Sequence, residues 1–225
     1  MSERPERIYQ FDDPGAGIKA SHPQPICAHM MRYIVAYTWA VDMPDEKRLR
    51  YLDYGCGSGM GVEFVSTAFQ RSYGVDVDDG ALAYARAWHG RNPNLIYSKT
   101  IEGGGYDLIT CIEMIEHIPV ELADRLMGRF SASLARDGML YLTTPIALTK
   151  DGVNPQNPWH VHEYQPGELG QMLEQYFKKV EIGPEGRTMG ARAWEPRLSL
   201  ASTSPSFPPR NGGPQDAPSR PRLLP

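Results

Sequence analysis

The chain has 225 residues, with 27 acidic and 23 basic side chains and a net charge of −4. It is long enough to bury a core of its own, and its charge gives no overall attraction to a polyanion. Three widely spaced cysteines argue against a disulfide scaffold or a thiolate zinc site, and no apolar run approaches the roughly 18 residues of a membrane span. These features favour a reduced, cytoplasmic protein without a membrane partner.

Apolar periodicity predicts that strands and helices alternate through the middle of the chain. Such alternation predicts an α/β fold, in which a parallel sheet is covered on both faces and binds ligands at the carboxyl ends of its strands. Helices are expected over 23–44, 59–71, 80–90, 120–138 and 166–177, and strands over 48–55, 71–78, 94–99, 106–113, 137–145 and 178–183.

The two ends of the chain differ from this middle part. From Pro196 onward the chain holds eight of its 20 prolines and shows no periodicity, a composition typical of disorder. The sequence therefore predicts an N-terminal helical arm over 1–46, a ligand-binding domain over 47–194 and a proline-rich disordered tail over 195–225.

The stretch YLDYGCGSGMG, residues 51–61, has glycine at every second position from Gly55 to Gly61. A strand that runs into glycines and then a helix brings bare backbone close to a ligand. The dinucleotide pattern G-x-G-x-x-G fails, because its third glycine would fall on Met60 or Val62. What remains is Asp53, two residues before a G-x-G-x-G.

This motif resembles the first motif of the class I S-adenosylmethionine-dependent methyltransferases. The resemblance implies a Rossmann-like, doubly wound, mostly parallel seven-stranded sheet with helices on both faces. S-adenosylmethionine carries a sulfonium and an ammonium but no phosphate, so an acid such as Asp53 suits the methionine end of its site. The implied cofactor-binding residues are Asp53, Gly55, Cys56, Gly57, Gly59, Asp76, Val77 and Glu113.

Asp76 follows the second predicted strand, 17 residues after Gly59. An acid at this place can accept hydrogen bonds from ribose hydroxyls. The spacing of Asp78 and Asp79 favours an N-cap for the next helix, although the resemblance also places Asp78 near adenine. The remaining adenine candidates are Thr100, Ile101 and Glu102.

Glu113, Glu116 and His117 follow the fourth predicted strand, in the segment CIEMIEHIP. If this segment were helical, the three side chains would share one face above the methyl group. Two carboxylates and an imidazole can act as a general base for a hydroxyl or can bind a divalent cation. His160 or His162, which alternate in NPWHVHEY, could complete a Mg²⁺, Mn²⁺ or Zn²⁺ site.

The pattern E-x-x-E-H with a distant histidine resembles two groups of methyltransferases. One group comprises the O-methyltransferases of ubiquinone biosynthesis, and the other comprises metal-dependent enzymes that methylate the 2′-hydroxyl at the ends of small RNAs. Both imply an oxygen acceptor. The leading hypothesis is a methyltransferase acting on a hydroxyl of a small molecule; the alternatives are an RNA 2′-O-methyltransferase and a non-catalytic cofactor-binding protein. Three roles remain open for the cluster: metal binding by Glu113, Glu116, His117 and His160, metal-free acid/base catalysis, and a structural role.

Overall fold

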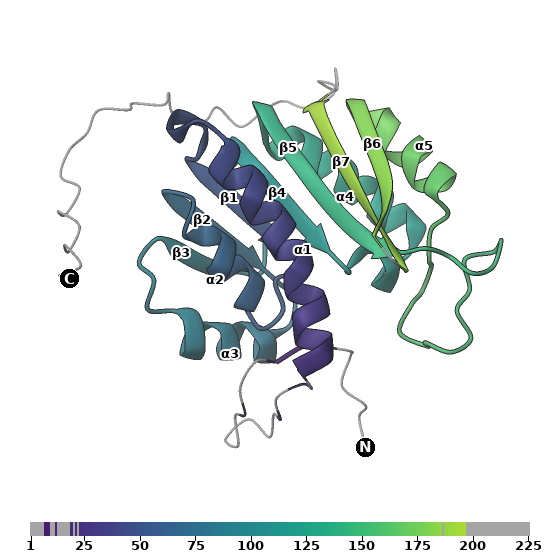
Figure 1. Cartoon of the computed structure of the whole chain (residues 1–225), viewed down its shortest axis with the longest axis horizontal. Helices are drawn as coiled ribbons and strands as arrows, with labels where there is room; N and C mark the ends of the chain where they lie inside the picture. Colours follow the sequence, from purple (N-terminus) through teal and green to yellow (C-terminus); the bar gives the residue numbers. More distant parts are fainter. Residues whose placement is uncertain are drawn as a thin grey trace.

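A computed structural model describes residues 7–9, 12, 19, 21, 23–185 and 187–196. Seven strands form one sheet in the order β3-β2-β1-β4-β5-β7-β6 (Figure 1). Neighbouring strands from β3 to β5 are parallel, whereas β7 is antiparallel to both β5 and β6. Among the described helices, none is both long and apolar enough to span a membrane. The predicted doubly wound α/β fold is confirmed.

The chain passes through these elements in the order that the sequence predicts, up to its last strand. The helices are α1 (Pro23–Asp42), α2 (Met60–Ser66), α3 (Asp79–His89), α4 (Val120–Ser133) and α5 (Pro166–Tyr176), with short 3₁₀ turns η2 (Asp45–Lys47) and η3 (Ile115–His117). The strands are β1 (Arg50–Tyr54), β2 (Arg71–Val75), β3 (Leu95–Ser98), β4 (Tyr106–Ile112), β5 (Leu134–Pro145), β6 (Phe177–Glu185) and β7 (Thr188–Pro196).

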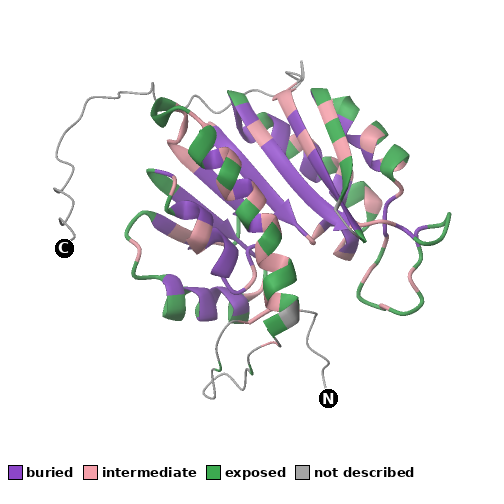
Figure 2. Ribbon diagram, in the orientation of Figure 1, coloured by how far each residue is buried: buried purple, intermediate pink, exposed green. Residues whose placement is uncertain are grey.

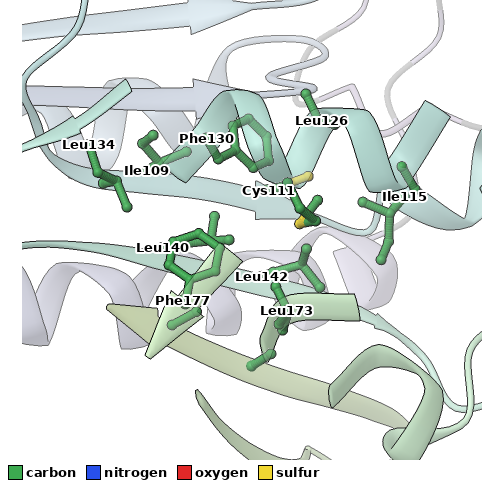
Figure 3. Close-up of a cluster of buried hydrophobic side chains, with 14 of the residues drawn as sticks. Ile109, Cys111, Ile115, Leu126, Phe130, Leu134, Leu140, Leu142, Leu173 and Phe177 are labelled. Atoms are coloured by element: carbon green, nitrogen blue, oxygen red, sulfur yellow. The ribbon is translucent and has the colours of Figure 1, made fainter. Parts of the chain in front are cut away.

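Helices α1, α2 and α3 cover one face of the sheet, and α4 and α5 cover the other (Figures 1 and 2). Successive residues of a strand point to opposite faces. Leu108 of β4 therefore packs with α1 and α2, while Ile109 packs with Phe130 and Phe177 on the other side (Figure 3). Both faces of the central strands are buried, which explains why their sequences are almost continuously apolar.

Two predicted boundaries need correction. The helix expected to reach residue 138 ends at Ser133, because Leu134 already pairs with Tyr106 at the start of β5. Strand β7 was not predicted as a segment, and it continues through Pro196, two residues into the predicted tail. The rest of that tail, residues 197–225, lies outside the described residues.

Candidate active site

The glycine loop, Gly55 to Gly59, leaves the carboxyl end of β1 and leads into α2. Gly55, Gly57 and Gly59 have φ angles of 80°, 52° and 85°, which residues with a Cβ rarely adopt. A Cβ on Gly59 would also lie 2.6 Å from the Tyr97 hydroxyl oxygen. The loop therefore presents bare backbone beside the switch point between β1 and β4, where ligands bind in open α/β sheets.

Asp53 lies in β1 below this loop and is fully buried. Its carboxylate accepts hydrogen bonds from the Tyr33 hydroxyl at 3.0 Å and from the Thr110 hydroxyl at 2.6 Å. Burial nevertheless raises the pKa of Asp53 to about 7, because a charged group loses its hydration there. Asp53 is not among the residues that line the cavity described below, so its predicted place beside the cofactor's methionine end stays a prediction.

Asp76 follows the end of β2 and is almost completely buried. The backbone N–H groups of Gly57 and Asp78 each donate to its carboxylate at 2.9 Å, which joins the glycine loop to the end of β2. The Asp78 side chain caps α3 by accepting from the Ala81 N–H, so the N-cap prediction is confirmed. Asp76 is thus held at the carboxyl edge of the sheet, beside the loop.

A cavity of about 480 Å³ opens over the glycine loop. One wall is the loop itself, from Gly55 to Ser58, and another is a face of α1 that carries His29, Arg32 and Tyr33. The end of β4 and the segment around Trp159 close the opposite side. The volume lies in the range of small-molecule sites.

Glu113 lines this cavity immediately after β4. Its backbone has φ 50°, a rare conformation for a residue other than glycine. The Glu113 N–H donates to the Thr143 carbonyl, and its carboxylate pairs with Arg32 of α1 at 3.3 Å. Backbone strain of this kind persists where neighbouring structure enforces it, and it is concentrated at functional sites.

The helical condition under which Glu113, Glu116 and His117 would share one face is not met. Only η3 forms, and the reversed φ of Glu113 turns its side chain toward Arg32. Glu116 is buried instead, where the Thr144 hydroxyl donates to its carboxylate at 3.0 Å. Burial, with Glu113 nearby, raises the pKa of Glu116 well above its usual range. The three side chains therefore do not share a helical face.

Instead, His117 and His160 gather with Glu116 at the cavity wall. One ligand atom from each of the three lies within 4.8 Å of the others. Nδ1 of His117 is 2.9 Å from the Trp159 carbonyl oxygen, and Nδ1 of His160 is 2.6 Å from a Glu163 oxygen. Because both Nδ1 atoms face acceptors, each neutral ring carries its proton on Nδ1 and its lone pair on Nε2.

His162 and Glu113 stand apart from this group. Nε2 of His162 is 2.7 Å from a Glu168 oxygen at the start of α5, so of the two alternating histidines the structure brings only His160 to the cluster. Glu113, which was predicted as a metal ligand, is not a member of the three-residue cluster found in the described part of the chain.

The remaining predicted residues divide between the cavity and its surroundings. Cys56 lines the cavity, whereas Val77 is 74% exposed beyond Asp76. Of the adenine candidates, Ile101 is buried in the core, while Thr100 and Glu102 are exposed.

Several residues of the cavity wall are not among the predicted site residues, including Arg7, His29, Arg32 and Tyr33. His29, Arg32 and Tyr33 share one face of α1 at helical spacing, and this spacing is the signal that could have found them. Burial lowers the pKa of His29 to about 4, so this imidazole is neutral. Arg7 also lines the cavity, and no sequence pattern links it to Asp76, 69 residues away.

Comparison with known proteins identifies the family. A family model described as a methyltransferase domain matches residues 28–179. The chain belongs to this methyltransferase domain family. The match includes α1 from residue 28 onward and all the elements that carry the glycine loop, Asp76 and the Glu116–His117–His160 cluster.

Curated relatives agree with this assignment. A probable S-adenosylmethionine-dependent methyltransferase of Mycobacterium tuberculosis is 28% identical over 153 residues, 63% of this chain and 55% of the relative. A ubiquinone biosynthesis O-methyltransferase of Bordetella bronchiseptica is 33% identical over 98 residues, 40% of this chain and 39% of the relative. The matched part of this chain thus spans about half the length, or less, of these two relatives.

Solved structures share the fold at low identity. Magnesium protoporphyrin IX methyltransferase from Synechocystis PCC 6803, with bound SAH, has a TM-score of 0.58 at 16% identity, covering 82% of this chain and 95% of that one. The N-methyltransferase NodS from Bradyrhizobium japonicum has a TM-score of 0.56 at 16% identity, covering 74% and 97%. These similarities support the seven-stranded methyltransferase fold.

Proposed function

We propose that the protein transfers the methyl group of S-adenosylmethionine to a hydroxyl group of a small molecule. One observation carries this proposal: the glycine loop and the Glu116–His117–His160 cluster line the same cavity. A cofactor held at the loop and an acceptor held at the cluster would meet there. Proximity and orientation supply most of the catalysis in such a reaction.

The residues present fit this cofactor. The loop presents bare backbone to the cavity at Gly55 and Gly57, and Asp76 offers a carboxylate that already accepts pairs of donors. Backbone and a carboxylate suit a ligand that bears ribose hydroxyls and positive charge but no phosphate. When bound, the cofactor supplies an electrophilic methyl group on a sulfonium.

His117 is the proposed base for the acceptor hydroxyl. The Trp159 carbonyl fixes the ring with its lone pair on Nε2, and imidazoles titrate near neutral pH. Buried Glu116, anchored by Thr144, lies 4.0 Å from this Nε2. Because its pKa is raised, Glu116 would stabilise positive charge on the ring only after losing its own proton. Glu113, paired with Arg32, stays on the cavity wall as a positioning residue.

A divalent cation is the second candidate for the same cluster. Glu116, His117 and His160 offer one carboxylate and two imidazoles, a donor set that suits Zn²⁺ better than Mg²⁺. Glu163, which also accepts from Asn154, would hold His160 in the orientation for binding. A cation here would lower the pKa of an acceptor hydroxyl, and binding it would require Glu116 to lose its proton.

The two alternative functions have less support. An RNA substrate would need a basic surface, but the candidate cations are scattered along the sequence: Arg32, Lys47, Arg48, Arg50, Lys99, Lys178 and Lys179. Several of them pair with acids in the structure: Lys47 with Asp137, Lys99 with Asp79, and Lys179 with Glu195. This arrangement favours a small acceptor over a polyanion. A non-catalytic binding protein would have no use for an ordered histidine pair beside the cofactor loop.

The test is transfer of labelled methyl groups from S-adenosylmethionine to a panel of phenols and aliphatic alcohols, with a short RNA in parallel. Labelling of a hydroxyl compound, reduced about a hundredfold or more in kcat by H117A, is the expected result. Labelling of the RNA alone would select the RNA alternative. Cofactor binding without any transfer across the panel would favour the non-catalytic protein.

A further inference from the structure

An N-terminal strap, defined here as Arg7 to Tyr9, lies across the glycine loop. The Ser58 hydroxyl donates to the Ile8 carbonyl at 2.6 Å. The Tyr9 ring packs edge-on against Tyr84 of α3, with centroids 5.0 Å apart. Both Arg7 and Ile8 line the cavity. The strap is therefore fixed at three successive residues to the elements that form the proposed cofactor site.

Arg7 makes the strongest of these contacts. Its two terminal nitrogens donate to the two oxygens of Asp76, at 3.1 and 3.2 Å. Asp78 lies 3.8 Å from the same guanidinium. The Arg7 side chain is only 17% exposed, so this forked, charge-assisted pair is sheltered from water.

The Asp76 carboxylate has no acceptor position left. An ionised carboxylate offers about four lone-pair sites. In the structure the N–H groups of Gly57 and Asp78 and the two nitrogens of Arg7 supply four donors. The backbone donors belong to the loop and the start of α3, so only the Arg7 fork can be exchanged without unfolding the site.

A vicinal diol presents the same pattern as this fork, with two neighbouring donors aimed at two carboxylate oxygens. Ribose hydroxyls and the Arg7 guanidinium would thus compete for one place. We propose that Arg7 is a competitive latch: it occupies the ribose position in the free protein, and the cofactor must displace it from Asp76 to bind. This inference rests on the proposed function, because it takes Asp76 as the ribose ligand.

The cofactor can bind only to molecules in which the latch is open. The apparent affinity for the cofactor is therefore the intrinsic affinity multiplied by the open fraction. Removing the latch should therefore tighten binding. The experiment is calorimetric titration of the full-length protein with S-adenosylhomocysteine, comparing wild type, R7A and R7K. R7A should bind about fivefold to thirtyfold more tightly, and R7K, which keeps the charge but loses the fork, should lie between them.

Two further variants make the result specific. Y9A loosens the strap without touching Asp76 and should also tighten binding, by a smaller factor. R192A is the matched control, because Arg192 also pairs with a carboxylate, Glu181, but lies on β7 away from the cavity. It should bind as wild type does, and thermal melts would verify that all variants fold.

The possible failures are distinguishable. If every folded variant binds and R7A is no tighter than wild type, the latch is wrong while the proposed function stands. Weaker binding by R7A would likewise overturn the latch, since it would make Arg7 a ligand of the cofactor. An absence of binding in every variant would overturn the proposed function and this inference with it.

Discussion

The hydroxyl of Tyr33, on α1, donates to the buried carboxylate of Asp53, on β1, at 3.0 Å. This bond ties the N-terminal helix to the strand that carries the glycine loop. The same Tyr33 ring lies against Gly61 of α2 and lines the cavity. Helix α1 therefore helps to hold the candidate site together. Three substitutions around this contact, Y33F, D53N and G61A, test its role.

Y33F removes the hydroxyl and leaves the ring. It should lower the free energy of unfolding by about 1–2 kcal/mol, because Asp53 loses one of its two hydroxyl partners inside the protein. Urea unfolding near pH 7 measures this change. Since the Tyr33 hydrogen bond lowers the pKa of Asp53, that pKa should rise further in Y33F. Unchanged stability would show that the bond does not form.

Asp53 should make stability depend on pH. Its pKa of about 7 in the folded protein lies above the value of about 3.9 in an unfolded chain. Folding therefore favours the neutral acid, so its contribution is complete below about pH 4 and is lost as pH rises through about 7.

The side chain at position 53 of the D53N variant carries no charge at any pH. The variant should therefore lack the decrease in folding stability that Asp53 causes as pH rises. Between pH 5 and 8, the free energy of unfolding of D53N should rise relative to wild type by roughly 3 kcal/mol. Urea unfolding at pH 5, 6.5 and 8 provides the comparison, in which all other titrating groups are shared. Parallel pH profiles for the two proteins would contradict the buried, neutral Asp53.

G61A tests the close approach of α1 to α2. A Cβ at Gly61 would overlap the Tyr33 ring, so the substitution should cost about 1–3 kcal/mol through overpacking. The matched control is G167A in α5, where an added Cβ meets nothing within 4 Å. Its stability should be unchanged or raised by up to about 1 kcal/mol. Thermal melts compare the two variants. Similar changes in melting temperature for G61A and G167A would argue against the close contact between α1 and α2.

If the cluster binds a metal ion, substitutions of His160 and His162 should have different effects. Protein loaded with Zn²⁺ and then dialysed should retain about one ion per chain, and H160A should lose it, because His160 belongs to the three-residue cluster. H162A should retain it, since His162 faces Glu168 instead. Elemental analysis gives the stoichiometry. Zinc lost equally from both variants, or never bound, would leave His117 as a metal-free base.

The local motifs could be predicted from the sequence because their signals are short-range. Strand, loop and helix are contiguous around Gly55–Gly59, and Asp76 and Asp78 follow β2 directly. Strand β7 escaped prediction because its buried face is built largely from small residues such as Ala191 and Ala193, which give a weak alternating pattern.

The shape of the cluster depended on tertiary contacts. Glu113, Glu116 and His117 do not form the helix that would place them on one face, because Arg32 and the Thr143 carbonyl hold Glu113 at a positive φ. Arg32 comes from α1, 81 positions away in the chain. Local periodicity carries no information about such a partner, and the same holds for Arg7 at Asp76.

The most direct test of the central claim is the affinity of the wild-type protein and of D76A for S-adenosylhomocysteine, measured by calorimetry. Asp79 gives the matched control, because it is also an acid at the start of α3 but is 82% exposed and pairs with Lys99. Wild type and D79A should bind alike. D76A should bind about tenfold more weakly or worse, because the loss of two charge-assisted hydrogen bonds to ribose outweighs the release of Arg7. Equal binding by D76A would contradict the ribose role of Asp76, and no binding by folded wild-type protein would contradict the methyltransferase function itself.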